Sequence, residues 1–259
     1  MKLTFVLKIC YTGAEKEGIM MSVFMPLWIA EAVFAALFIV FGYPDATGKG
    51  FICKMAACAL YSANGLYAFS ISTHSQYGVM MLAGLVCGWI GDIFLALNPF
   101  TKDKQNRKLN LTTKTFGGLF FLLGHAAYIA AFAQLLAQAH AFRFITFALA
   151  MGCVLVCFAL IFGLCKVSAG RFTPAIALYS AGLAGMCALT ICAAQQVFGG
   201  NTVLQCILIS APLLFAFSDV TLALRVADKE RFESLPMRSF SLGAYFLAQM
   251  LLGLSIRLV

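Results

Sequence analysis

Two aspartates lie inside apolar stretches of the chain, and their type and setting make them the first candidates for chemistry. Asp92 lies in residues 88–97 (GWIGDIFLAL), and Asp219 lies in residues 218–224 (SDVTLAL). Each follows a small residue and precedes Leu-Ala-Leu at the same spacing. A charged side chain at the centre of a bilayer costs about 2.5–3.5 kcal/mol on insertion scales. We therefore predict that both aspartates are functional and that they lie at one depth.

The composition indicates a membrane protein as the scaffold for these aspartates. The chain has 259 residues, of which 62% are hydrophobic and only 11% are charged. This is far from the usage of soluble domains. At about 20 apolar residues per span, eight spans fit. The predicted fold is all-α, a polytopic membrane helix bundle with spans near residues 21–42, 51–73, 78–97, 115–138, 142–165, 174–198, 202–224 and 239–258.

The remaining residues leave little room for a second domain. Residues 1–20 are expected to form a short N-terminal tail, because their apolar part is too short and too interrupted for a span or a signal peptide. Residues 21–259 are expected to form a single eight-span membrane domain. The ten cysteines mostly lie within apolar runs, so they are expected to be small buried residues without disulfide or metal roles.

The distribution of basic residues predicts the topology. The first, third, fifth and seventh loops, together with Lys54, contain 13 of the 18 Lys and Arg residues. The positive-inside rule places these odd-to-even loops in the cytoplasm and both termini outside it. The net charge of +8 is then explained by topology, and no nucleic-acid partner is expected. We predict an integral, multi-pass protein of the bacterial inner (cytoplasmic) membrane.

An internal repeat is visible in the second and sixth spans. Residues 57–63 (ACALYSA) and 175–181 (AIALYSA) agree at six of seven positions. The two aspartate phrases fall on the third and seventh spans in the same order. Four spans per unit make the copies parallel. We therefore predict two parallel four-helix repeats, repeat 1 at about 21–138 and repeat 2 at about 142–258, related by an axis along the membrane normal.

Further polar residues are predicted to lie at the depth of the aspartates. Asp92 and Asp219 each precede a polar loop residue by six positions, or about 9 Å along a helix. Even-numbered spans begin on that same side, and their polar residues fall in their first halves. The set predicted to line one cavity open to the cytoplasm comprises Lys54, Tyr61, His125, Tyr128, Tyr179, Tyr245 and Gln249, with Ser218 beside Asp219.

Three other features leave alternatives open. Lys54 either belongs to the cavity, where it could hold a phosphate, or extends its amine to the headgroups. Glu31, in the middle of the first span, either pairs with Lys54 or lines the site. Gly84, Gly88 and Gly91 form a small-residue face that predicts close helix packing.

Four short motifs follow one another along the chain: Gly91-Asp92-x-x-Leu95, Phe121-x-x-Gly124-His125-x-x-Tyr128, Ser218-Asp219-x-x-Leu222-Ala223 and Tyr245-x-x-x-Gln249. Together they resemble the motifs of the YhhN-type lysoplasmalogenase family of integral membrane ether hydrolases. The resemblance covers nearly the whole chain after residue 20. It implies eight spans and hydrolysis of the vinyl ether bond of lysoplasmalogens, giving a fatty aldehyde and glycerophosphoethanolamine or glycerophosphocholine. It also implies that Asp92 and Asp219 are the catalytic pair.

The family's lysine in the second span matches Lys54, but the neighbouring proline associated with it is absent. The role of Lys54 therefore stays open. The expected partners are a lysophospholipid substrate and the lipid bilayer. No cofactor and no bound metal are expected. Oligomeric state and headgroup preference are not fixed by the sequence.

The implied chemistry suits two buried carboxyl groups. Vinyl ether hydrolysis begins when an acid protonates the alkenyl carbon, and water then attacks the oxocarbenium ion. The resulting hemiacetal collapses to an aldehyde and an alcohol. Burial and a nearby like charge keep one carboxyl group protonated near neutral pH, while its partner acts as the base. The sequence does not indicate which aspartate is the acid.

Other classes of function remain as alternatives. A membrane transporter would use the intramembrane aspartates as a proton or cation relay. A metal hydrolase would use Asp92, His125 and Asp219 as ligands, although an oxygen-rich set is a poor zinc signature. A non-catalytic lipid-binding or structural protein is the third alternative.

Overall fold

The computed structural model describes residues 2–43, 46–73, 75–101, 107–166 and 173–259, with side chains described for most of the residues after Met21. Every regular element in these ranges is a helix. The elements are α1 (Lys2–Phe41), α2 (Gly48–Ser70), α3 (Ser75–Leu97), the 3-10 helix η1 (Asn98–Thr101), α4 (Arg107–Gln138), α5 (Phe144–Leu164), α6 (Thr173–Gln196), α7 (Thr202–Ala227), α8 (Lys229–Phe232) and α9 (Leu235–Leu258).

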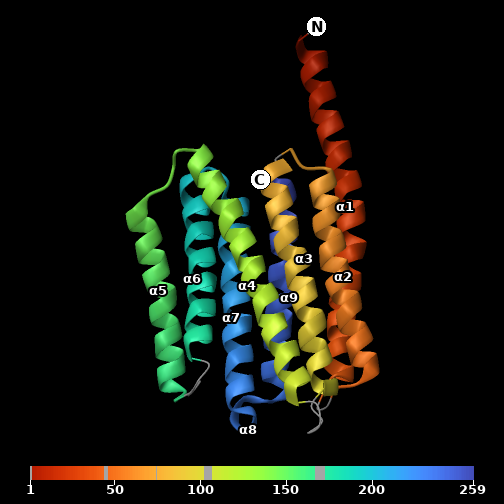
Figure 1. The fold of residues 1–259 in the computed structure, drawn as a ribbon. Helices are drawn as coiled ribbons and strands as arrows, with labels where there is room; N and C mark the ends of the chain where they lie inside the picture. The colour runs from red at the N-terminus through yellow and green to blue at the C-terminus, as the bar shows by residue number, and fades with distance from the viewer. Residues whose placement is uncertain (1, 44–45, 74, 102–106, 167–172) are drawn as a thin grey trace.

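The long helices run up and down in one bundle (Figure 1). The helices α1, α3, α5 and α7 end at the lower end of this view, where α2, α4, α6 and α9 begin, and both termini lie at the upper end. Consecutive long helices are therefore antiparallel. The predicted all-α polytopic bundle is confirmed.

In the described part of the chain, seven helices are long and apolar enough to cross a membrane: Ser22–Phe41, Gln76–Phe100, Leu111–Gln138, Phe144–Leu164, Ala177–Gln196, Thr202–Arg225 and Leu235–Leu258. The helix α2 is not among them, although it has 23 residues and runs beside α1 and α3 (Figure 1). Its buried face contains Lys54, Ser62 and Asn64, which lower its apolar character. The predicted count of eight spans therefore stays a prediction.

The first helix is longer than its predicted span. It begins at Lys2 and continues without a break to Phe41, so residues 2–20 extend the helix of the first span. The apolar part that can cross a membrane is Ser22–Phe41, which agrees with the predicted 21–42. A separate role for the expected tail stays a prediction.

Several helix starts are fixed by capping side chains at the residues that precede them. Thr47 Oγ1 accepts a hydrogen bond from the Gly50 amide at 3.0 Å, at the start of α2. Asn201 Oδ1 accepts one from the Leu204 amide at 3.0 Å, at the start of α7. Ser234 caps α9 in the same way, followed by a proline in the first turn. Such caps satisfy amides that have no partner inside the helix.

Helices α3 and α4 approach each other closely through glycine. A Cβ added at Gly84 would lie 2.2 Å from the Tyr128 ring, and one at Gly91 would lie 2.8 Å from the Phe121 ring. On the facing helix, a Cβ at Gly124 would lie 3.2 Å from the Gly84 carbonyl oxygen. The small-residue face predicted for α3 is therefore used for packing, and it brings the side chains of α4 over α3.

The helix contacts follow the pattern that a two-fold repeat would produce. In the predicted repeat, α2 corresponds to α6, α3 to α7, and α4 to α9. The helix α2 of the first half packs against α9 of the second, and α6 of the second half packs against α4 of the first. The pairs α3–α4 and α7–α9 both pack extensively. The repeat itself, with its axis along the membrane normal, stays a prediction.

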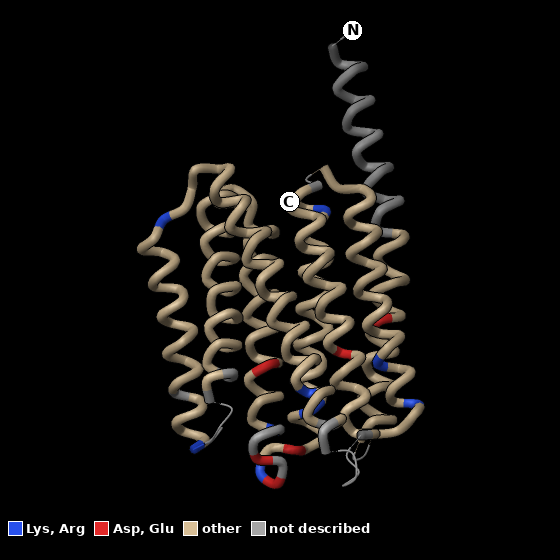
Figure 2. Tube along the Cα trace, in the orientation of Figure 1, with Lys and Arg blue, Asp and Glu red and all other residues tan. Residues whose placement is uncertain are grey.

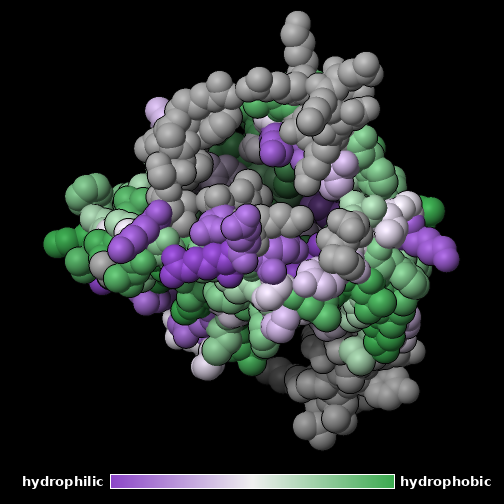
Figure 3. All heavy atoms as spheres, turned by 90° about the horizontal axis from the view of Figure 1, so that it is seen from below, coloured by the Kyte–Doolittle hydropathy of each residue, from purple (hydrophilic) through white to green (hydrophobic). Residues whose placement is uncertain are grey.

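Charge and apolar surface are segregated. Figure 2 shows most Lys and Arg residues toward the lower end of the bundle. Viewed from below, hydrophilic residues gather across the middle of the face and hydrophobic residues flank them (Figure 3). At the edge of the bundle, α5 exposes Phe144, Ile145, Leu149 and Leu164. These surfaces fit a multi-pass membrane protein, and the cytoplasmic orientation of the lower end stays a prediction.

Candidate active site

The carboxylate of Asp92 is buried among four donors. Lys54 Nζ lies 2.7 Å from its Oδ1. Its Oδ2 accepts a hydrogen bond from the Tyr245 hydroxyl at 2.5 Å and longer ones from Tyr61 at 3.4 Å and the Cys58 thiol at 3.3 Å. Asp92 is 3% exposed and Lys54 8%. One ion pair and three hydrogen bonds thus hold this carboxylate in place.

Three of these donors come from one face of α2. Lys54, Cys58 and Tyr61 are spaced i, i+4, i+7, so their side chains point the same way toward α3. Sequence reasoning found Lys54 and Tyr61 but treated Cys58 as an ordinary buried residue. Its position between them, one turn from each, is the signal that would have identified it.

A hydrogen-bonded chain leads away from Asp92 along α9 to α4. The Tyr245 hydroxyl, which donates to Asp92, accepts a bond from Gln249 Nε2 at 3.0 Å. Gln249 Oε1 in turn accepts a bond from the Tyr128 hydroxyl at 3.2 Å. Gly88 makes room for this chain, since an added Cβ would lie 3.0 Å from Gln249 Nε2. Three residues predicted for the site are thus brought together by direct bonds.

Asp219 has a simpler environment. Its Oδ2 accepts a hydrogen bond from the Tyr179 hydroxyl, which repeats the contact between Tyr61 and Asp92 in the corresponding helices. No lysine or arginine pairs with Asp219 in the part of the chain that the structure describes. The side chain is partly accessible, whereas Asp92 is buried.

His125 packs beside Tyr179 and does not bond to either carboxylate in the described residues. Its ring meets Tyr179 edge to face with centroids 5.2 Å apart. Nδ1 lies 2.7 Å from the Phe121 carbonyl oxygen, so this nitrogen carries the proton and donates. Nε2 is buried and has no partner among the described residues. Its capacity to accept a hydrogen bond is therefore unused among these residues.

Phe215 joins the surroundings of the two aspartates. Its ring centroid lies 5.0 Å from that of His125 and 5.6 Å from that of Tyr245. Because Phe215 and Asp219 are four residues apart on α7, they share a helix face. The two carboxyl groups thus lie on either side of one aromatic cluster, a contact that sequence spacing did not reveal.

The family model of the YhhN family matches residues 51–256. The chain belongs to the YhhN family. The match contains both aspartates and every predicted site residue, and it leaves α1 outside. No curated protein and no solved structure matched the chain. The resemblance inferred from the motifs is confirmed at the level of the family.

Within this YhhN fold, two of the alternatives for Glu31 and Lys54 are wrong. Glu31 accepts a hydrogen bond from Asn64 Nδ2 at 3.3 Å and is fully buried. Lys54 pairs with Asp92 instead of Glu31, and it is buried, so it does not extend to the headgroups. Sequence spacing could not decide this, because both acids lie on helices that flank α2.

Ser218 acts through its backbone. Its carbonyl oxygen accepts hydrogen bonds from Thr221 Oγ1 at 2.7 Å and from Ser241 Oγ at 3.2 Å, which ties α7 to α9. The predicted supporting role of its side chain at the site stays a prediction.

The metal-site alternative required Asp92, His125 and Asp219 to converge. Among the described residues, no group of three or more His, Cys, Asp and Glu side chains is arranged to hold a metal ion. His125 Nδ1 is engaged by a backbone carbonyl, and Asp92 by Lys54. This donor set therefore does not form a three-ligand centre.

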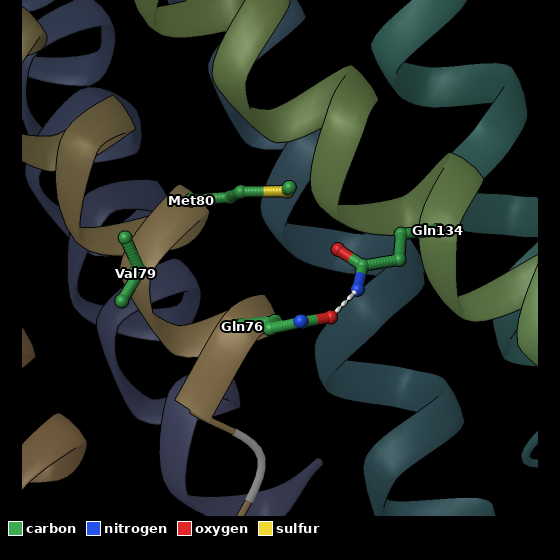
Figure 4. Close-up of a pocket in the computed structure, with 4 residues that line it drawn as sticks. All are labelled: Gln76, Val79, Met80 and Gln134. Atoms are coloured by element: carbon green, nitrogen blue, oxygen red, sulfur yellow. Dashed lines mark hydrogen bonds between the residues drawn. The ribbon is translucent and has the colours of Figure 1, made fainter.

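An open pocket of about 490 Å³ lies away from the aspartates (Figure 4). Its lining includes Gln76, Val79, Met80 and Gln134, and the Gln134 amide donates to the Gln76 carbonyl oxygen. Gln76 precedes Asp92 by 16 residues, or about 24 Å along α3. This pocket is uncharged and belongs to the upper end of the bundle. The predicted cavity open to the cytoplasm stays a prediction.

Proposed function

We propose that this YhhN-family protein is a lysoplasmalogenase that hydrolyses the vinyl ether bond of lysoplasmalogens by carboxylate-pair catalysis within the membrane. The observation that carries the proposal is the difference between Asp92 and Asp219. Lys54 forms an ion pair with Asp92, whereas no lysine or arginine pairs with Asp219 among the described residues. A reaction that needs one protonated and one ionised carboxyl group uses this difference directly.

Asp219 is the proposed acid. Ionising a carboxyl group within an apolar helix bundle and without a paired cation is costly, so we assign the proton to Asp219. The Tyr179 hydroxyl donates to Oδ2, which leaves Oδ1 to hold the proton. Asp219 is also the more accessible of the two. In the first step, Oδ1 gives its proton to the alkenyl carbon, and the ether oxygen becomes part of an oxocarbenium ion.

Asp92 is the proposed base. Its negative charge, held by Lys54, offsets the positive charge that develops on the substrate. The attacking water gives its proton to the Tyr245 oxygen while Tyr245 passes its own proton to Asp92. The hemiacetal hydroxyl then returns a proton to Asp219, and the leaving glycerol oxygen takes one back through Tyr245. The products are an aldehyde and an alcohol, and both aspartates regain their starting states.

The deciding experiment uses the purified protein in detergent or vesicles. Lysoplasmalogen is supplied in parallel with its saturated ether analogue, and aldehyde release is measured with and without EDTA. We expect aldehyde from the vinyl ether alone, because the saturated analogue has no alkenyl carbon to protonate. Equal rates on both lipids, or no aldehyde from lysoplasmalogen, would contradict the proposal. Loss of activity in EDTA would point to a metal-dependent reaction.

One observation favours a second candidate, a proton transporter. The hydrogen-bonded chain from Asp92 through Tyr245 and Gln249 to Tyr128 resembles a relay for protons. Proteoliposomes that contain a pH-sensitive dye test this candidate. Proton flux that disappears in Gln249→Leu, together with no aldehyde release, would replace the hydrolase by the transporter.

A further inference from the structure

Two arginines share one glutamate at the lower end of the bundle. Arg225 holds Glu233 with two bonds, from Nε at 2.7 Å and from Nη2 at 3.2 Å. Arg238 reaches the same carboxylate only through Nη1, at 3.5 Å. The three side chains are 10–14% exposed. Two cations and one anion leave the cluster with one positive charge in excess.

The excess charge lies on Arg238. Arg225 uses the fork of its guanidinium on both carboxylate oxygens, the strong geometry for this pair. Arg238 Nε, by contrast, is buried without a partner among the described residues. A buried charged donor with an unmade hydrogen bond is costly, so an anion that completes it would be bound favourably.

Arg238 lies between the loops and the catalytic pair. It precedes Tyr245 by seven residues on α9, which places both on one face and Arg238 about 10 Å nearer the lower end. The Phe38 ring is flanked by two cations, with Arg238 Cζ 5.6 Å and Lys54 Nζ 5.7 Å from its centroid. The Phe38 ring of α1 is therefore a shared neighbour of Arg238 and of the lysine that pairs with Asp92.

We infer that Arg238 binds the phosphate of a lysophospholipid headgroup while the vinyl ether lies at the aspartates. This rests on the proposed function for the identity of the lipid. A guanidinium offers several donors to phosphate oxygens, and Lys54 cannot serve because Asp92 occupies it. The three-carbon glycerol backbone then connects the phosphate at Arg238 to the ether oxygen deeper in the bundle. Arg225 keeps Glu233 neutralised, so that the carboxylate does not repel the phosphate.

Binding of a lipid that cannot be hydrolysed tests the inference apart from turnover. A saturated ether lysophosphocholine and the corresponding alkylglycerol, which has no phosphate, are titrated into protein in detergent micelles and followed by calorimetry. Arg238→Gln should weaken binding of the phosphate-bearing lipid at least about tenfold and leave the alkylglycerol unchanged. Arg257→Gln, on the same helix at the opposite end, is the matched control and should bind both lipids as the unaltered protein does.

A second variant guards against a folding failure of Arg238→Gln. A Cβ at Gly42 would lie 2.8 Å from the Phe38 carbonyl oxygen and 2.9 Å from Arg238 Nη2, so Gly42→Ala shifts the guanidinium and the end of α1 without removing the charge. Gly42→Ala should also weaken binding of the phosphate-bearing lipid and leave binding of the alkylglycerol unchanged. Equal affinity of Arg238→Gln and the unaltered protein for that lipid overturns the inference, whether or not the protein hydrolyses lysoplasmalogen. Selective loss of binding in a protein without hydrolytic activity upholds the phosphate site and rejects the proposed reaction.

Inorganic phosphate distinguishes a headgroup site from a site for free phosphate. We expect millimolar phosphate to leave lipid affinity unchanged, because the lipid's chain and glycerol contribute to its binding. Displacement of the lipid by phosphate at comparable concentrations, and loss of that displacement in Arg238→Gln, would assign the site to free phosphate and overturn the headgroup assignment.

Discussion

The surroundings of Asp92 and Asp219 begin alike and then diverge. In each half, a tyrosine from the preceding helix donates to the aspartate, Tyr61 to Asp92 and Tyr179 to Asp219. In the first half, Lys54 adds an ion pair. Lys54 precedes Ala57, the first residue of the repeated phrase, by three positions. The residue three positions before Ala175, which begins the second copy of the phrase, is Phe172. The two aspartates therefore differ in whether a lysine stands at the matching position one helix earlier.

The helices from the opposite halves extend this difference. Against Asp92, α9 supplies Tyr245, whose hydroxyl bonds directly to the carboxylate. In the second half, α4 supplies His125. This residue packs on Tyr179 and makes no hydrogen bond to Asp219 among the described residues. A pair of aspartates needs unlike environments to act as acid and base. The unlike environments come from the side chains of α9 and α4, although α2 packs against α9 in the same way that α6 packs against α4.

The largest effect is expected from breaking the buried ion pair. Lys54→Met and Asp92→Asn each leave an uncompensated charge and should destabilise the protein by about 3–5 kcal/mol. The double variant should recover much of this loss. Chemical unfolding in detergent measures all three, and additive losses in the double variant would show that the two residues do not stabilise each other.

Asp219→Asn should lower activity instead of stability. It removes no charge from an ion pair, so folding should be unchanged, while aldehyde release should fall at least about 100-fold, the scale of a lost general acid. Asp228→Asn, outside the aromatic cluster at the end of α7, is the control with full activity expected. Near-normal turnover by Asp219→Asn would remove Asp219 from the mechanism.

The two tyrosine hydroxyls should differ in their contribution to stability. Tyr245→Phe removes a donor from an ionised group and should cost about 1.5–3 kcal/mol, whereas Tyr179→Phe removes one from a neutral group and should cost about 0.5–1.5 kcal/mol. Unfolding of both variants in one detergent gives the comparison. Equal costs would indicate that both aspartates carry the same charge.

The smallest effects are expected from glycine substitutions at the helix contacts of the two halves. Gly84→Ala would push a Cβ into the Tyr128 ring and should destabilise the α3–α4 pair by about 1–3 kcal/mol. In the second half, Gly243 on α9 has open space around the added Cβ. Gly243→Ala should therefore stabilise the protein by up to about 1 kcal/mol. A neutral Gly84→Ala would mean that α3 and α4 separate easily.

The sequence predicted the features that depend on local spacing. Apolar composition and the length of the apolar runs indicated the helical bundle. The repeated phrases identified both aspartates, together with Tyr61 and Tyr179, which bond to them. The partner of Lys54 was not predictable, because Glu31 and Asp92 lie on helices on either side of α2 and only the helix rotation decides between them. The same holds for His125, whose ring is fixed by the Phe121 carbonyl one turn earlier. Phe215 was missed because an apolar residue gives no polar signal.

Glu31 has a consequence for how the protein is made. This carboxyl group is buried in α1, and its hydrogen-bond donor, Asn64, is in α2. While the ribosome is still extending the second helix, the first has a polar group that would face lipid, with a penalty on the scale of about 2.5–3.5 kcal/mol for a charged residue. We expect α1 to wait beside the translocon until α2 emerges. The two would then enter the bilayer together as a hairpin.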